Sequence, residues 1–257
     1  MKKIILILAA FALVATGCKR SISTDNYRVT LSYPLEEGRE KPSLTVDISL
    51  DYPVGGLQDS VLAKMTTNIL ISALELEDEP AGVKATVDTF VSGLEENFRD
   101  ENLEFWKTDK DRLSEDQIND FYCWEHFVNG YFGERWKEYV TYINEYYTYS
   151  GGAHGMQGLI PVVLSTVTGD IVTEADIFTD GYDDALKEGL RAHLQDAFAD
   201  NAEDFECIFN KNIEPNGCFE VGKAGITYHY QPYEIAPYYL GVIPVTVPWS
   251  ELKAYLK

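Results

Sequence analysis

Histidine, cysteine and carboxylate side chains could carry acid–base or metal chemistry in this chain, but their spacing gives little support for it. The sequence has four histidines, and none of them belongs to an HExxH pattern. Cys123 and His126 form a single CxxH pair, which supplies only two of the four ligands that a structural zinc site needs. We therefore expect no metal ion and no cofactor, and we interpret Cys123 as a small buried residue beside Trp124.

Carboxylates are abundant, but no spacing pairs them for catalysis. Glu134, Glu138 and Glu145 lie in a segment rich in aromatic residues, and nothing in the sequence sets two of them on either side of a substrate. We therefore assign no catalytic residue. A hydrolase that acts on envelope polysaccharide stays open as an alternative, with His154 and a nearby carboxylate as its candidate groups.

His154 has the most unusual surroundings of the four histidines. Residues 149–155 read YSGGAHG, so glycines precede and follow the imidazole. Glycine permits positive φ angles and close backbone approach, which places this ring in a constrained turn. The ring could present a hydrogen bond to a ligand, or it could fix the turn by bonding a backbone carbonyl. We favour the second interpretation.

Residues 228–239 form a tyrosine-rich segment that contains Pro232 and Pro237. Tyrosine offers a large contact area with few rotatable bonds, which suits a protein-binding surface or a carbohydrate platform. The alternative is a rigid corner whose tyrosines bury their rings. We favour binding, and the candidate ligand-binding residues of this segment and of the glycine-rich turn are Tyr149, Gly151, Gly152, His154, Tyr233, Glu234, Pro237 and Tyr238.

Strands are predicted on both sides of these motifs. The alternation of apolar and polar residues has a period of two in several segments, which is typical of half-buried strands. From residue 134 the aromatic residues predict long strands joined by a turn at residues 143–145. The other predicted strands are 28–33, 44–50, 159–166, 170–173, 226–230 and 242–247.

Helices are predicted between the strands. Ser114 and Gln117 have the spacing of a capping box, which indicates a short helix. Longer helices are predicted by apolar residues at helical spacing over residues 58–74, 82–106 and 183–198. The predicted fold class is therefore α+β, with mainly antiparallel sheets packed with helices.

The N-terminal residues predict where the chain works. Lys2 and Lys3 precede eleven apolar residues, 4–14, and Ala-Thr-Gly-Cys follows at residues 15–18. At about 1.5 Å per residue this run is too short to cross roughly 30 Å of hydrocarbon, so it indicates an export signal. The pattern before Cys18 is a lipobox, which predicts a lipid on Cys18; secretion without lipid is the alternative. We expect a protein anchored by lipid to the bacterial envelope, on the outer membrane and facing the periplasm.

Three further cysteines follow Cys18 in the chain. Cys207 and Cys218 are separated by ten residues that include Pro215 and Gly217, which favour turns. In an exported protein a hairpin-like excursion could bring these two cysteines within disulfide range. A fully reduced state is the alternative.

Composition limits the partners. The chain is 45% hydrophobic and 13% aromatic, which argues against disorder, and its formal net charge is −21. This charge disfavours nucleic acid and anionic lipid headgroups and favours cationic partners, although solubility alone could explain it. We therefore expect no nucleic-acid partner, and contact with the membrane through the N-terminal lipid only.

Three motifs resemble the PdaC/RsiV-like extracytoplasmic domain family. The segment 149–155 resembles the junction between the two halves of that domain, and residues 225–238 and 243–252 resemble its C-terminal signature. The resemblance covers roughly residues 44–256 and implies a two-part α+β architecture. The predicted parts are a signal peptide at 1–18, a tether at 19–26, a PdaC-like N-terminal part at 27–150 and an RsiV-like C-terminal domain at 151–257.

The same resemblance implies recognition rather than catalysis. The family includes a lysozyme-binding ectodomain of an anti-sigma factor, and a module that precedes a deacetylase domain. We expect the binding module alone here. The resemblance thus implies a non-catalytic envelope lipoprotein that binds a basic protein such as lysozyme or a cell-wall glycan. The alternatives are the hydrolase named above and a structural or assembly lipoprotein.

Overall fold

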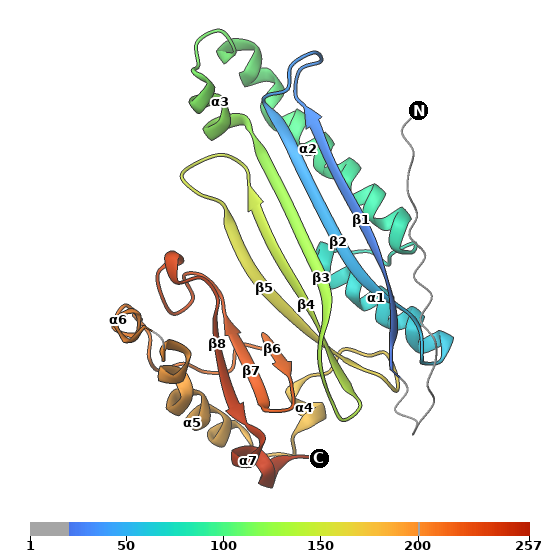
Figure 1. The fold of residues 1–257 in the computed structure, drawn as a ribbon, viewed down its shortest axis with the longest axis vertical. Helices are drawn as coiled ribbons and strands as arrows, with labels where there is room; N and C mark the ends of the chain where they lie inside the picture. Colours follow the sequence, from blue (N-terminus) through green and yellow to red (C-terminus); the bar gives the residue numbers. More distant parts are fainter. Residues whose placement is uncertain (1–20, 200) are drawn as a thin grey trace.

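The computed structural model describes residues 21–199 and 201–257, which form two β-sheets packed with helices (Figure 1). The predictions for Cys18 and the export signal therefore lie outside the described residues. The α+β class is confirmed. The strands are β1 (Ser23–Pro34), β2 (Ser43–Gly55), β3 (Trp124–Trp136), β4 (Tyr139–Tyr149), β5 (Met156–Ser165), β6 (Phe219–Val221), β7 (Gly225–Tyr230) and β8 (Ile243–Pro248).

The first sheet has five strands in the order β1-β2-β3-β4-β5. Strands β2 and β3 are parallel and the other neighbours are antiparallel. A parallel pair needs a long crossover, and the first three helices supply it.

Within residues 21–199 and 201–257, no helix has both the length and the apolar character needed to cross a membrane. The helices are α1 (Asp59–Leu74), α2 (Val83–Asp109), α3 (Glu115–Tyr122), α4 (Glu174–Ile177), α5 (Asp183–His193), α6 (Ala202–Phe205) and α7 (Trp249–Leu252), with short 3-10 turns η1 (Leu194–Phe198), η2 (Tyr238–Leu240) and η3 (Lys253–Tyr255).

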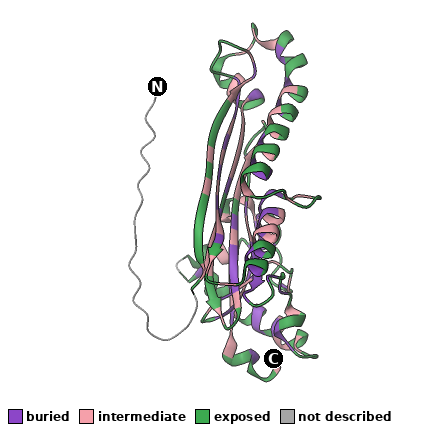
Figure 2. Ribbon diagram, turned by 90° about the vertical axis from the view of Figure 1, so that its right-hand side faces the viewer, coloured by how far each residue is buried: buried purple, intermediate pink, exposed green. Residues whose placement is uncertain are grey.

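Helices α1 and α2 cover one face of the five-stranded sheet (Figure 2). Val46, Ile48 and Leu50 of β2 are fully buried in one cluster with Val91 and Phe98 of α2. Successive side chains of a strand point to opposite faces, so the intervening residues lie on the other face. We call that other face the open face; it carries Asp47, Ser49, Phe127, Asn129, Glu145 and Tyr147.

The C-terminal lobe, residues 174–257, is built on the antiparallel sheet β6-β7-β8. Leu186 and Leu190 of α5 are fully buried in one cluster with Tyr228, Val245 and Val247 of this sheet. The predicted helix over 183–198 is thus present as α5 followed by the tighter turn η1. The same cluster includes Val163 of β5, so the core of the lobe continues onto the first sheet.

The lobe packs against β3, β4 and β5 of the five-stranded sheet. The Thr141 hydroxyl accepts a hydrogen bond from the Val221 N–H at 3.0 Å and lies 3.2 Å from the Val221 carbonyl oxygen. The rings of Trp136 and Trp249 stack with centroids 4.0 Å apart and an interplanar angle of 15°. The lobe also lies further along β5, where Gln231 Nε2 donates to the Leu159 carbonyl oxygen at 2.8 Å.

The β3–β4 region differs from the sequence prediction. No turn occurs at residues 143–145, because β4 runs unbroken through them and pairs with β3 and β5 on its two sides. The chain reverses between Trp136 and Tyr139 instead, where Lys137 adopts a φ of 52°. A lysine at a left-handed position gives no clear signal in a single sequence, so the pattern of aromatic residues did not reveal this turn.

Three further features of the structure differ from the sequence prediction. β1 begins at Ser23, within the segment expected to be a tether. The division expected after residue 150 falls in the β4–β5 loop, and β5 pairs with β4 in the first sheet. The strand expected at 170–173 is reduced to an isolated bridge between Leu164 and Ile171. The capping box of Ser114 and Gln117 is present as predicted.

His193 links α5 to the C-terminal helix α7. Its Nδ1 lies 2.7 Å from Asp196 Oδ2, and its Nε2 lies 2.9 Å from Glu251 Oε1. The hydrogen bond to Asp196, followed by that to Glu251, raises the pKa of His193 above its ordinary value of 6.5. A raised folded-state pKa adds stability that is present below the unfolded-state pKa and is lost as the pH rises through the folded-state pKa.

We predict that His193→Gln destabilises the protein more at pH 5.5 than at pH 8.5. Because the side chains of Asp196 and Glu251 are 75% and 48% exposed, the difference should not exceed about 1 kcal/mol. Urea unfolding of both proteins at the two pH values measures it. An equal loss at both pH values would show that the charge of His193 contributes nothing to stability.

Candidate functional site

The two motifs singled out in the sequence meet in space. His154, in the β4–β5 loop, stacks on Tyr238 of the C-terminal lobe with ring centroids 4.2 Å apart and an interplanar angle of 23°. His154 Nδ1 lies 2.8 Å from the Gly155 carbonyl oxygen, and Nε2 lies 3.2 Å from the Tyr233 hydroxyl. A carbonyl only accepts, so Nδ1 donates and Nε2 is left to accept from Tyr233. His154 therefore stabilises its own turn and also connects the β4–β5 loop of the first sheet to the C-terminal lobe.

The glycine-rich turn is fixed to the end of α3. Gly151 and Gly152 have φ values of 91° and 104°, which L side chains rarely adopt. The Gly152 N–H donates to the Asp120 carbonyl at 2.9 Å, and the Tyr149 hydroxyl lies 2.9 Å from the carbonyls of both Asp120 and Gly152. Tyr149, Gly151 and Gly152 thus shape the loop that presents His154.

Glu234 and Pro237 shape the opposing loop. Glu234 accepts hydrogen bonds from the Gln231 N–H at 2.8 Å and from Asn216 Nδ2 at 2.9 Å, so its carboxylate is used within the lobe. Pro237 is the residue before the turn η2 that carries Tyr238. Of the eight candidate residues, His154, Tyr233 and Tyr238 form one cluster and the other five hold it in place.

The cluster continues onto the open face through Tyr147. A Cβ atom at Gly155 would lie 2.5 Å from the Tyr147 ring, so this ring packs directly on the glycine backbone. Phe127 and Tyr147 are cross-strand partners whose rings are nearly parallel, with centroids 5.8 Å apart and an interplanar angle of 24°. We call the resulting set the aromatic row; it comprises Phe127, Tyr147, His154, Tyr238 and Tyr233.

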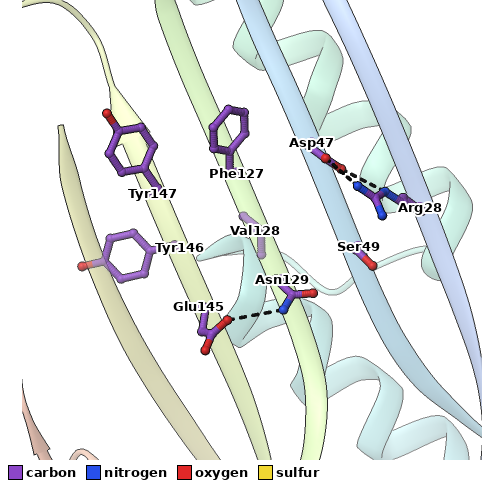
Figure 3. Close-up of a pocket in the computed structure, with 9 residues that line it drawn as sticks. All are labelled: Arg28, Asp47, Ser49, Phe127, Val128, Asn129, Glu145, Tyr146 and Tyr147. Atoms are coloured by element: carbon purple, nitrogen blue, oxygen red, sulfur yellow. Dashed lines mark hydrogen bonds and ion pairs between the residues drawn. The ribbon is translucent and has the colours of Figure 1, made fainter. Parts of the chain in front are cut away.

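A hollow of about 380 Å³ lies over Phe127 and Tyr147, and Figure 3 shows polar side chains around it. On the β1–β2 side, Arg28 Nη2 lies 2.7 Å from Asp47 Oδ2. Further along β3 and β4, Asn129 Nδ2 donates to Glu145 Oε2 at 3.4 Å. The complete lining is Arg28, Asp47, Ser49, Phe127, Val128, Asn129, Glu145, Tyr146 and Tyr147.

A second hollow, of about 430 Å³, shares Tyr147 with the first. Ser43 and Thr45 of β2, Glu125 of β3 and the turn around His154 are part of its lining. We call the two hollows together the sheet-face groove. Because Tyr147 lines both hollows, it stands at the middle of the groove.

The tyrosines of the groove are held neutral. Burial, followed by the nearby Glu125 charge, raises the pKa of Tyr147. Tyr131 lines neither hollow but lies beside the groove, and burial and its 2.9 Å hydrogen bond to Glu145 raise its pKa to about 12. These phenols therefore stay protonated and offer ring faces and hydrogen bonds. Among the described residues, no three or more His, Cys, Asp or Glu side chains gather closely enough to hold a metal ion.

The predicted disulfide is not formed in the structure. Cys123, Cys207 and Cys218 are free. The sulfur of Cys207 lies 3.8 Å from the Glu203 carbonyl oxygen, and that of Cys218 lies 3.6 Å from the Leu159 carbonyl oxygen. Burial raises the pKa of Cys218 to about 11, which keeps this thiol protonated. The segment that contains Pro215 and Gly217 does not bring the two sulfurs together.

Most residues of the groove were not predicted from the sequence. Arg28, Asp47, Phe127, Asn129 and Tyr147 were not candidates, and Glu145 was considered only as a catalytic carboxylate. Alternation within each strand would have assigned these residues to one face. Their assembly depends on the strand order, which the alternation does not contain.

Comparisons with known proteins identify the fold. The sequence profile of a family described as "Protein of unknown function (DUF3298)" matches residues 175–250, within the C-terminal lobe. The chain is similar to the crystal structure of a DUF3298 family member from Bacteroides fragilis NCTC 9343, with a TM-score of 0.78, 21% identity, and coverage of 92% of this chain and 94% of that chain. It is also similar to the structure of a DUF3298 family protein from Pseudomonas aeruginosa PAO1, with a TM-score of 0.63, 16% identity, and coverage of 92% and 95%. No curated protein matches the chain.

Proposed function

We propose that this protein is a non-catalytic recognition module of the bacterial cell envelope, and that it binds an uncharged stretch of cell-wall glycan in the sheet-face groove. The observation that carries the proposal is the pair of nearly parallel rings of Phe127 and Tyr147 in a hollow edged by Asp47, Asn129 and Glu145. Sugar rings have an apolar face that packs on aromatic rings, and an edge of hydroxyls that bond to planar polar side chains.

The length of the groove supports a chain rather than a single sugar. The hollow over Phe127 and the hollow beside His154 share Tyr147, so successive sugars could occupy both. The carboxylates of the groove repel anionic polymers, which favours uncharged sugar residues. The neutral phenols can both donate to and accept from hydroxyl groups.

Calorimetric titration of the chain starting at Lys19 with chitohexaose, an uncharged chain of β-linked N-acetylglucosamine, tests this function. We expect saturable one-to-one binding that changes little between low and high salt, because the ligand carries no charge. Maltohexaose, which has the same number of sugars in a different linkage, serves as the control ligand. Absence of saturable binding to chitohexaose at millimolar concentration would refute the proposal.

A basic protein such as lysozyme is a second candidate ligand. It is favoured by the net charge of −21, by Tyr233 of the aromatic row, which is 53% exposed, and by Tyr239, which follows Tyr238 in the chain and is 65% exposed. Titration with a c-type lysozyme at two salt concentrations separates specific from general attraction. Binding that persists at high salt supports a protein receptor, whereas binding that disappears indicates charge attraction alone.

Lipid attachment at Cys18 gives a further prediction. We propose that the protein is exported and anchored by this lipid to the outer membrane, facing the periplasm. In bacteria fed a labelled fatty acid, Cys18→Ser should lose all label and leave the outer-membrane fraction. The exposed Cys207 supplies the control Cys207→Ser, which should keep both. Label that persists in Cys18→Ser would contradict the anchor.

A further inference from the structure

A pocket on the helix-covered side of the first sheet lies on the opposite face from the sheet-face groove and is unused by the proposed function, although Val128 and Tyr146 are in the lining of both. It has a volume of about 410 Å³, within the usual range for small-molecule sites. Its walls are the end of α1 and the middle of α2, and its floor is made by β3, β4 and β5. The lining residues are Ser72, Ala73, Leu74, Glu75, Phe90, Leu94, His126, Val128, Asn144, Tyr146, Thr148 and Ile160.

Aromatic rings from a helix and a strand give the pocket flat surfaces. Phe90 of α2 lies against His126 of β3, with ring centroids 5.3 Å apart. Tyr146 of β4 lies over Gly158 of β5, where an added Cβ would be 2.5 Å from the ring. Phe90 and Tyr146 both line the pocket, so a planar ligand group finds aromatic partners there.

The polar groups of the pocket offer hydrogen-bond acceptors. Asn144 is only 2% exposed, and its Nδ2 donates to Ser72 Oγ at 3.1 Å and to the Ile160 carbonyl at 3.3 Å. Its Oδ1 is buried without a hydrogen-bond partner. A buried acceptor without a donor is costly, so a ligand N–H group at this atom would be favourable.

The charge of the pocket is negative. Glu75 is an exposed residue of the lining, and no lysine or arginine contributes to that lining. Burial raises the pKa of Tyr146, and the nearby charge of Glu75 raises it further. Burial lowers the pKa of His126, so this imidazole adds no positive charge at neutral pH.

We propose that this pocket binds a small organic cation that carries a planar ring and an amine. The ring packs between Phe90 and Tyr146, and the ammonium group lies towards Glu75 and the unpaired Asn144 Oδ1. Aromatic faces attract cations as well as apolar rings, so the two features of the pocket act on the same ligand. An organic carboxylate of the same size would be repelled by Glu75.

Three phenylalkyl probes that differ in the charge of their polar group test the proposal on the chain starting at Lys19: phenethylamine, 2-phenylethanol and 3-phenylpropionate. Calorimetry should give saturable binding of phenethylamine and none of 3-phenylpropionate. Glu75→Gln should weaken phenethylamine binding about tenfold and leave 2-phenylethanol binding unchanged. Glu77→Gln removes a charge that is also exposed but does not line the pocket, and should have no effect.

Two results would overturn the inference. One is equal affinity for phenethylamine and 3-phenylpropionate. The other is the same loss of phenethylamine binding in Glu75→Gln and Glu77→Gln, since that indicates general attraction to an acidic protein. Because chitohexaose occupies a different face of the sheet, it should not compete with phenethylamine. The two proposals can therefore fail independently.

Discussion

Replacing Tyr147 by alanine should remove most of the affinity of this protein for chitohexaose. Tyr147 lines both hollows of the sheet-face groove, and its ring lies between Phe127 and the turn at Gly155. Removing the ring deletes the stacking surface at the centre of the site. Central aromatic residues commonly contribute about 2 kcal/mol or more, so we expect a loss of about thirtyfold or more, measured by calorimetry.

Two control variants test whether the loss of affinity comes from the ring of Tyr147. Tyr147→Phe keeps the ring and loses only the hydroxyl, so it should retain most of the affinity. Tyr239→Ala removes a tyrosine that is 65% exposed and lines neither hollow, so it should bind as the unaltered protein does. Equal affinities for Tyr147→Ala and Tyr239→Ala would place the glycan elsewhere on the surface.

Gly225→Ala should have the largest effect on stability, a loss of about 3 kcal/mol. Gly225 pairs with Pro248 across β7 and β8. A Cβ atom there would lie 2.1 Å from the carbonyl oxygen of Val247 and 2.8 Å from its carbonyl carbon. Both are backbone atoms of the neighbouring strand, so the clash can be relieved only by separating the strands. The resulting shift would disrupt the core of the C-terminal lobe.

Gly93→Ala provides the matched comparison for this prediction. Gly93 lies on the exposed side of α2, and an added Cβ would meet nothing within 4 Å. Alanine is the better helix former, so this variant should gain about 0.5–1 kcal/mol. Urea unfolding of both variants tests the pair. A Gly225→Ala protein as stable as the unaltered chain would mean that β7 and β8 are not paired at this position.

The sequence predicted the helices and strands better than the turns that connect them. The amphipathic spacing of Leu186 and Leu190 predicted α5, and Ser114 with Gln117 predicted the start of α3, because these signals are local. The turn after Trp136 depends on Lys137 in a left-handed conformation. Many residue types can adopt this conformation at a cost in free energy, provided that the flanking strands pair strongly. The position of this turn therefore depends on the pairing of β3 with β4 and not on the residue types within the turn.

The candidate site was predictable in part for the same reason. His154 and Tyr238 stood out because glycines, prolines and tyrosines mark each motif, and the structure brings both together. Asp47 and Phe127 became neighbours only through the parallel register of β2 and β3, which the intervening helices establish. Alternation predicts the face of a strand but not the identity of the neighbouring strand, so the groove could not be assembled from one sequence.

An NMR titration tests the central claim most directly. Tyrosine rings of the chain starting at Lys19 are labelled, chitohexaose is added to saturation, and the Tyr147 signals are identified by their absence from Tyr147→Phe. We predict that the Tyr147 signals shift most strongly while those of Tyr239 stay in place. Binding of chitohexaose that leaves the Tyr147 signals unmoved would contradict it.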